Sequence, residues 1–81
     1  MEDRYINLVD TNVYGSKYCM IQGIKVSGKE LASGIMEKIN DAMKNCKANG
    51  GDPNQIFNAA IQVLEANGYT VDLIYPTTVK V

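Results

Sequence analysis

The chain has no histidine and no tryptophan, and it has only two cysteines, Cys19 and Cys46. Histidine is the side chain that most often transfers protons near neutral pH, so its absence removes the commonest acid–base catalyst. The cysteines do not form a CxxC motif, and without histidine they offer no ligand set for zinc or an iron–sulfur cluster. We therefore expect reduced thiols, no metal or other cofactor and no catalytic residues. On these grounds the protein is predicted not to be an enzyme.

The chain also lacks a strong charge of either sign and a long hydrophobic run. Eight Lys and Arg residues stand against nine Asp and Glu residues, which gives a net charge of -1, and the basic residues are scattered. Nucleic-acid binding depends on clustered cations that neutralise phosphates, so this pattern argues against such a partner. No apolar run approaches the roughly 20 residues that a membrane-spanning helix needs. The sequence thus predicts a cytoplasmic protein without a membrane partner.

The length and the apolar content predict one globular domain, 1–81. Hydrophobic residues make up 46% of the chain and charged residues 21%, which is the balance of a folded protein and not of a disordered one. A chain of this size buries only about 60% of the surface that it exposes when unfolded. One hydrophobic core is therefore the most that it can support.

Three stretches alternate between two sets of residues with the period of two that is typical of strands. They are 4–9, 17–26 and 69–75. Turn-forming residues fill the connection between the first two, 10–16, which predicts a β-hairpin with a long loop. Pro76 ends the third strand or marks a sheet edge, and the tail is expected to form a short fourth strand or a frayed end.

Two helices are predicted between the second and third strands. In the first, apolar residues recur at spacings of three and four from Leu31 to Cys46. The second begins with a capping box formed by Asp52 and Gln55. It ends at Gly68, beyond which the chain is expected to turn back in a Schellman motif.

The order of these elements predicts an α+β fold, a small two-layer sandwich of the form ββααβ with an optional last strand. The sheet is expected to be mostly antiparallel, with the third strand antiparallel to the second and parallel to the first. Two antiparallel helices would cover one face. The other face remains apolar in either register, because it keeps Tyr5 and Val9 or Ile6 and Leu8. We expect this surface to be covered by something, and a homodimer is a natural way to cover it.

The stretch 23–30, GIKVSGKE, comes within one residue of the phosphate-binding signature GxxxxGK[ST]. Its last residue is Glu30, whose carboxylate would repel phosphates, and 24–26 prefers an extended strand. The same residues match a capping box, in which Ser27 and Glu30 satisfy each other's backbone N–H groups. We therefore predict a helix start here and no nucleotide site. Contact of Lys25 or Lys29 with an anionic partner is the alternative.

Tyrosine is the most suggestive feature of the composition, with five residues against one phenylalanine. Tyrosine is enriched at protein interfaces, where one end of the side chain is dry and the other wet. Tyr14, in the polar loop 10–16, either contacts a partner or folds back on the sheet. The candidate interface residues are Tyr5, Asn12, Tyr14, Tyr18, Lys25, Lys29 and Tyr75.

These observations favour a small binding protein that acts through the loop 10–16, the helix-free sheet face or an edge strand. In size, mild acidity and lack of a catalytic set, the chain resembles the small inhibitors that phages and other mobile elements encode, including anti-CRISPR-type proteins. The resemblance is one of kind and implies an anti-defence inhibitor of a larger host protein. The second hypothesis is a small-ligand binder, for nucleotide-like molecules, in which Tyr14, Tyr18 and Lys25 or Lys29 line a pocket at a dimer seam. Nucleic-acid binding comes third.

Overall fold

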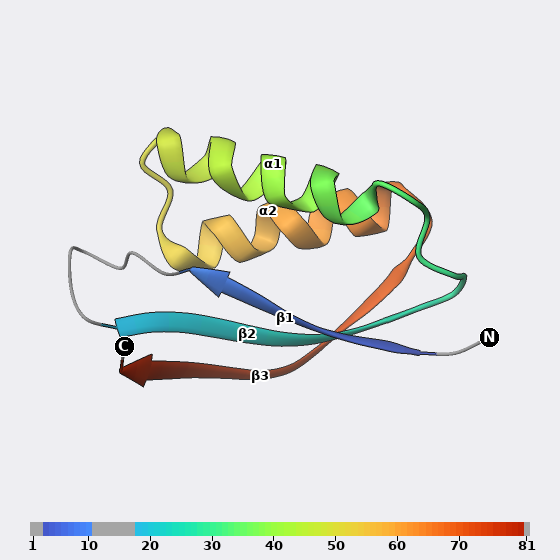
Figure 1. The fold of residues 1–81 in the computed structure, drawn as a ribbon, viewed down its shortest axis with the longest axis horizontal. Coiled ribbons are helices and arrows are strands. Elements are labelled where there is room, and N and C mark those ends of the chain that lie inside the picture. Colours follow the sequence, from blue (N-terminus) through green and yellow to red (C-terminus); the bar gives the residue numbers. More distant parts are fainter. Residues whose placement is uncertain (1–2, 11–17, 81) are drawn as a thin grey trace.

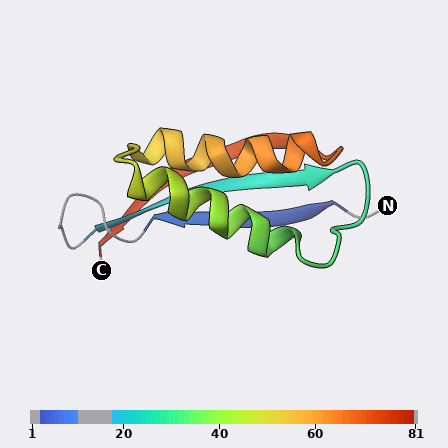
Figure 2. The ribbon, with the colours of Figure 1, turned by 90° about the horizontal axis from the view of Figure 1, so that it is seen from above.

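The computed structural model describes residues 3–10 and 18–80, which form one three-stranded sheet with two helices on one of its faces (Figures 1 and 2). This is the α+β sandwich that the sequence predicts, in the order ββααβ. The elements are β1 (Arg4–Asp10), β2 (Tyr18–Ser27), α1 (Ile35–Ala48), α2 (Pro53–Ala66) and β3 (Thr70–Lys80).

Strand β2 lies in the centre of the sheet and pairs antiparallel with both β1 and β3. Strand β3 therefore runs parallel to β1, as the topology of the two helices predicts. Ile6 pairs with Ile24 and Leu8 with Gln22, so the even-numbered residues of β1 and β2 share a face. That face is the buried one, because Leu8 and Ile24 both belong to the hydrophobic core. The connection between β1 and β2 lies outside the described residues.

The optional fourth strand is not a separate element. Strand β3 continues without a break from Thr70 to Lys80, and Pro76 lies inside it, opposite Gln22. Proline is tolerated in a strand at the edge of a sheet, where one side of the backbone has no neighbour to bond. The tail therefore extends the third strand and pairs with the first half of β2.

The predicted start of α2 and the predicted Schellman end are confirmed. Asp52 accepts a hydrogen bond from the Gln55 N–H at 2.9 Å, and the Gln55 side chain accepts one from the Asp52 N–H at 3.0 Å. At the other end, the Tyr69 N–H donates to the Leu64 carbonyl at 3.1 Å, with Gly68 at φ 91°. Helix α1 ends in the same way, at Gly50. A glycine suits both ends because the left-handed conformation strains residues with a Cβ.

The capping box predicted for Ser27 and Glu30 is wrong. Ser27 is the last residue of β2, and α1 begins at Ile35, after Gly34, which makes no side-chain cap hydrogen bond. Ser27 pairs with Thr70 in the β2–β3 ladder, so its backbone is held in the sheet and does not begin a helix. The Tyr69 hydroxyl binds the Ala32 N–H and the Glu30 carbonyl, and two such hydrogen bonds contribute about as much as a capping residue, which is worth about 0.5 to 2 kcal/mol. Residues 23–27 are thus extended and form no phosphate-binding loop.

The two helices bury the sheet unequally. Helix α2 contacts both β1 and β3, whereas α1 packs mainly against α2 and stands farther from the sheet (Figure 1). The core nevertheless reaches both helices. Its buried members are Leu8, Ile24, Val26, Ile35, Ile39, Phe57, Ala60, Leu64 and Tyr69.

Two polar contacts secure the ends of this core. Tyr69 is 4% exposed, and its hydroxyl accepts a hydrogen bond from the Ala32 N–H at 2.7 Å and donates one to the Glu30 carbonyl at 3.1 Å. It thereby holds the connection between β2 and α1. At the far end of β1, the buried carboxylate of Asp10 accepts from the Lys47 ammonium of α1 at 2.7 Å. This ion pair links α1 to β1, a strand with which α1 has few other contacts.

We expect Tyr69→Phe to lower the free energy of unfolding by about 1 to 3 kcal/mol, because it leaves two partly buried backbone groups without their partner. Chemical denaturation followed by far-UV circular dichroism measures the change. Tyr5→Phe is the matched control, since Tyr5 is 72% exposed and its hydroxyl has no hydrogen bond within the described residues. Equal stability of both variants would show that the Tyr69 hydroxyl does not hold the connection.

Candidate protein-binding face

The face of the sheet opposite the helices carries the side chains that alternate with the core. In β1 and β2 these are the odd-numbered residues, since the even-numbered ones face the helices. In β3 an extra residue, Ile74, interrupts the register, because Ile24 pairs with Leu73 while Gly23 pairs with Tyr75. We call this surface the open sheet face. It is formed by Tyr5, Asn7, Val9, Ile21, Gly23, Lys25, Asp72, Ile74 and Tyr75.

Tyr75 lies flat across the centre of the open sheet face. An added Cβ on Gly23 would stand 2.5 Å from a carbon of the Tyr75 ring, so the ring occupies the space that any other residue would fill. The Tyr75 hydroxyl reaches past β2 and donates a hydrogen bond to the Asn7 side-chain oxygen on β1, at 2.9 Å. One aromatic side chain thus spans all three strands. A bulge in β3 makes this possible, because it sets two successive side chains, Ile74 and Tyr75, onto the same face.

The apolar side chains around Tyr75 leave a shallow hollow of about 270 Å³. The residues that line it are Tyr5, Ile6, Asn7, Gly23, Ile24, Ile74 and Tyr75. Tyr5 is 72% exposed, Ile74 46% and Tyr75 44%. Large apolar groups are therefore presented to solvent around a depression that could receive a side chain from a partner.

The only charges on the open sheet face neutralise each other, within the residues that the structure describes. Lys25 and Asp72 lie opposite each other in the β2–β3 pair, with their charged atoms 3.6 Å apart. Both side chains are well exposed, so the pair contributes little to stability. Its effect is to leave the face without net charge, which favours contact with an apolar surface over contact with a phosphate.

The structure brings together three of the candidate residues, Tyr5, Lys25 and Tyr75, on the open sheet face. Lys29 lies elsewhere, in the connection after β2, with its ammonium 4.8 Å from the centre of the Tyr69 ring. Tyr18 begins β2, but its side chain lies outside the described part of the chain, as do Asn12, Tyr14 and most of the loop 10–16. The hypothesis of a ligand pocket names Lys25 or Lys29 together with Tyr14 and Tyr18, and because both tyrosine side chains lie outside the described residues this pocket stays a prediction.

Sequence reasoning did not single out Gly23 or Asn7. A glycine within a strand pattern often marks a place where another group approaches the backbone closely, and this signal was available at Gly23. The Asn7 contact with Tyr75 gave no such signal, because it depends on a register shift between β2 and β3.

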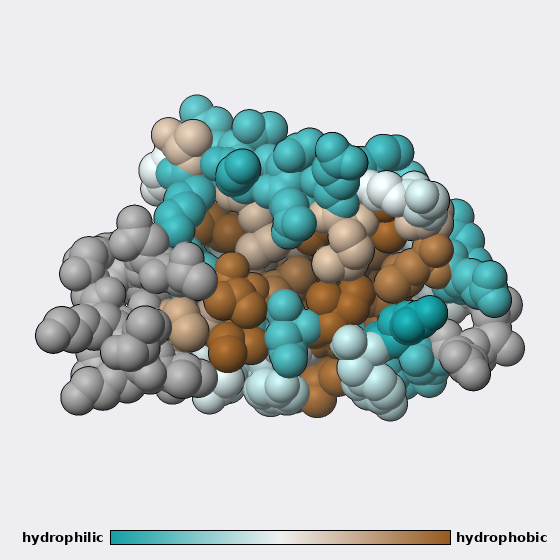
Figure 3. Space-filling view, viewed as in Figure 1, coloured by the Kyte–Doolittle hydropathy of each residue, from teal (hydrophilic) through white to brown (hydrophobic). Residues whose placement is uncertain are grey.

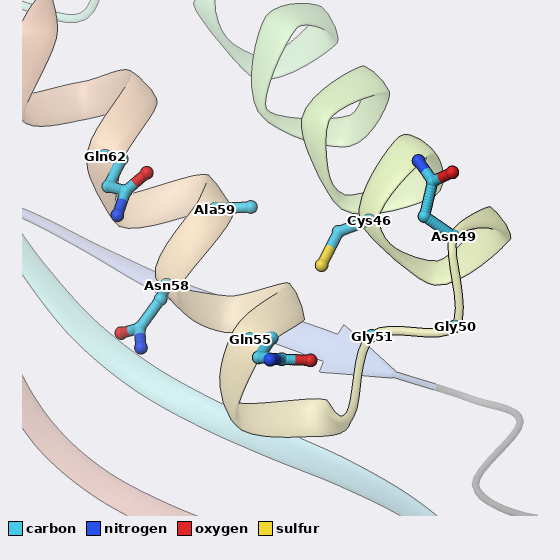
Figure 4. Close-up of a pocket in the computed structure, with 8 residues that line it drawn as sticks. All are labelled: Cys46, Asn49, Gly50, Gly51, Gln55, Asn58, Ala59 and Gln62. Atoms are coloured by element: carbon cyan, nitrogen blue, oxygen red, sulfur yellow. The ribbon is translucent and has the colours of Figure 1, made fainter.

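A larger hollow, of about 460 Å³, lies between the end of α1 and the first turns of α2 (Figure 4). The Cys46 sulfur and the Ala59 methyl point into the gap between the helices, and side-chain amides surround it. Two of these amides are already engaged, since Gln55 caps α2 and Asn49 donates to the Asn45 carbonyl. The hollow has no charged lining residue, and we regard it as a gap between helix ends.

Residues 3–10 and 18–80 contain no helix long and apolar enough to cross a membrane. Within the same residues no group of three or more His, Cys, Asp or Glu side chains could hold a metal ion. Cys19 and Cys46 are both free and half-buried.

No protein-family model, curated protein or solved structure matches the chain, so the surfaces of the fold are the basis for a functional proposal.

We expect Gly23→Ala to displace the Tyr75 ring, because the new methyl group would overlap it. The hydrogen bond to Asn7 would break, while the core on the other face would remain intact. In proton NMR spectra, the contacts between the Tyr75 ring and the side chain of Asn7 should disappear, and the far-UV circular dichroism should not change. Persistence of these contacts in the variant would contradict the flat placement of the ring.

Proposed function

We propose that the chain is a non-enzymatic binding module that attaches to a larger protein through the open sheet face. The observation that carries this proposal is the cluster of exposed apolar residues around one hollow, formed by Tyr5, Ile74 and Tyr75. Single exposed apolar residues are ordinary on protein surfaces, but a contiguous group of them marks an interaction site.

The chemistry of this face suits a protein partner. Tyrosine offers a large apolar area with few rotatable bonds, and aromatic residues are common among the residues that dominate binding energy. Tyr75 is already held in place by its hydrogen bond to Asn7 and by its contact with Gly23. Because the ring is ordered before binding, less conformational entropy is lost when a partner docks.

The sequence-based hypothesis of a small inhibitor is one form of this function. In that form, a phage or mobile element would encode the chain. In the cytoplasm of the host, the chain would bind a defence protein and block a surface that this protein needs for its function. The chain would also self-associate. The size of the protein and the neutral, apolar character of the open sheet face support this form, but they do not identify the partner.

The small-ligand hypothesis receives less support from the geometry. Lys25 is paired with Asp72 on the open sheet face, and Lys29 stacks on the ring of Tyr69, which is a core residue. The hypothesis needs one of these two lysines at the ligand, and each of them already contacts a side chain within the fold. A thermal-shift screen against nucleotides tests this alternative, because a ligand raises the melting temperature as its concentration exceeds its dissociation constant.

We expect Ile74→Lys to weaken binding to the larger partner at least about tenfold, because it places a charge beside the hollow of the open sheet face. The partner is first captured from the native host with the unmodified chain and identified by mass spectrometry, and affinities are then measured with purified proteins. Ala66→Lys is the matched control, since it adds the same charge at an exposed position of α2. The proposal fails if Ala66→Lys weakens binding as much as Ile74→Lys, or if neither does.

A further inference from the structure

Strand β1 is an edge strand without the usual protection. In the part of the chain that the structure describes, β1 pairs only with β2, so one side of its backbone has no strand beside it. Natural proteins usually protect such an edge with a proline, charged side chains or a bulge, because an open edge can pair with another strand. The sequence of β1, RYINLVD, contains no proline, and its register with β2 is regular over all seven residues. Its charged residues, Arg4 and Asp10, stand at the two ends of the strand, and the residues between them carry no charge.

The opposite edge of the sheet, β3, has the protection that β1 lacks. Its register with β2 shifts between Gly23 and Ile24, and Pro76 removes one N–H group from the strand. A bulge and a proline both disfavour pairing with a further strand. The two edges are therefore not equivalent, and an added strand should choose β1.

The sequence of β1 is complementary to itself when a second copy is laid antiparallel to it about Asn7. An aromatic residue then meets a β-branched one on the open sheet face, which is a favourable cross-strand pair. This pair is Tyr5 with the partner's Val9, and both side chains are exposed in a single copy, at 72% and 41%. Asn7 meets the partner's Asn7, Ile6 lies opposite the partner's Leu8, and Arg4 lies opposite the partner's Asp10, whose carboxylate stays buried in its ion pair with Lys47.

This register also keeps the two faces of the sheet consistent. It pairs odd-numbered residues with odd-numbered ones, and even with even, so core-facing residues meet core-facing residues across the seam. The helices of both copies would lie on the same side of one continuous sheet. A register shifted by one residue would instead set the helix-covered face of one copy beside the open sheet face of the other.

The flank of α1 above β1 supplies a second surface that the same partner would cover. Figure 3 views the molecule from this side and shows apolar side chains between the polar outer surface of the helices and the sheet. Met36 on α1 is 41% exposed, and Met43 lines a hollow of about 340 Å³ that also reaches Val9 and Ile56. These side chains are accessible because α1 stands away from the sheet.

We infer that two copies of the chain associate through their β1 strands, antiparallel and centred on Asn7, to form one six-stranded sheet. The association is two-fold symmetric and closed, so it stops at the dimer. It joins the open sheet faces of both copies and places Tyr5 of one copy beside the partner's Val9. The inference deepens the self-association included in the proposed function, and it does not depend on the identity of the larger partner.

Two double variants of β1 test the contact between the β1 strands of the two copies, which we call the β1 seam. Both variants remove the same apolar side chains, Tyr5 and Val9. In Tyr5→Glu/Val9→Lys, each introduced charge faces an opposite charge on the partner, whereas in Tyr5→Glu/Val9→Glu it faces a like charge. Both variants carry the same residue at position 5, opposite Lys25 of the same copy. Positions 5 and 9 are exposed, and within one copy they lie about 13 Å apart along the strand, so neither double variant should unfold the domain. We expect the dissociation constant of the dimer, from light scattering over a range of concentrations, to be at least about tenfold higher for the like-charged variant. Equal constants would overturn the β1 seam.

A cysteine cross-link locates the seam independently. In a background of Cys19→Ala/Cys46→Ala, Asn7→Cys places two thiols directly opposite each other, and mild oxidation should give a disulfide-linked dimer. Thr77→Cys, at an exposed position of β3, is the matched control. Preferential cross-linking through position 77 would show that the dimer forms at the other edge.

A chain that stays monomeric at all concentrations would overturn self-association itself. Loss of partner binding in Ile74→Lys would in that case still support the open sheet face as the binding surface for the larger protein.

Discussion

The burial of one face of β2 beneath the helices is the constraint on which the rest of the structure depends. Ile24 is fully buried and Val26 nearly so. Because side chains alternate along a strand, burying these two residues commits their neighbours to the opposite face. A chain of 81 residues with two helices has nothing left within its described part to cover that second face. The open sheet face is thus a consequence of packing a small core.

The same constraint explains how the connection after β2 is organised. Since β2 extends to Ser27, which pairs with Thr70 of β3, the chain must cross to the helical layer without help from a helix cap. Tyr69 takes over this role. Its ring belongs to the core and its hydroxyl binds two backbone groups of the connection. A single side chain therefore joins the end of α2, the core and the start of α1.

The open sheet face and the β1 edge meet at Tyr5 and Val9, which belong to both. A dimer formed through β1 would use the outer backbone edge of that strand, whereas the hollow around Ile74 and Tyr75 opens on the face of the sheet, with Tyr5 among the residues that line it. Dimerisation and attachment to a larger protein are therefore compatible, and the dimer would present two hollows on one continuous sheet. Two attachment points on a symmetric module can raise the apparent affinity for a multivalent target without any new contact.

Local patterns in the sequence determined the elements and their order. Strands show in the sequence as alternation with a period of two. The capping box at Asp52 and the Schellman end at Gly68 are made by hydrogen bonds between residues close in the chain, so they can be predicted without knowledge of the fold. The sequence also indicated that one sheet face would stay apolar, without deciding whether Tyr5 and Val9 or Ile6 and Leu8 would lie on it. Only the tertiary structure decided where α1 begins, because strand pairing with β3 outweighed a local cap, and only it set the Tyr75 ring over Gly23. Both outcomes depend on contacts between segments that are distant in the chain, which no short stretch of sequence encodes.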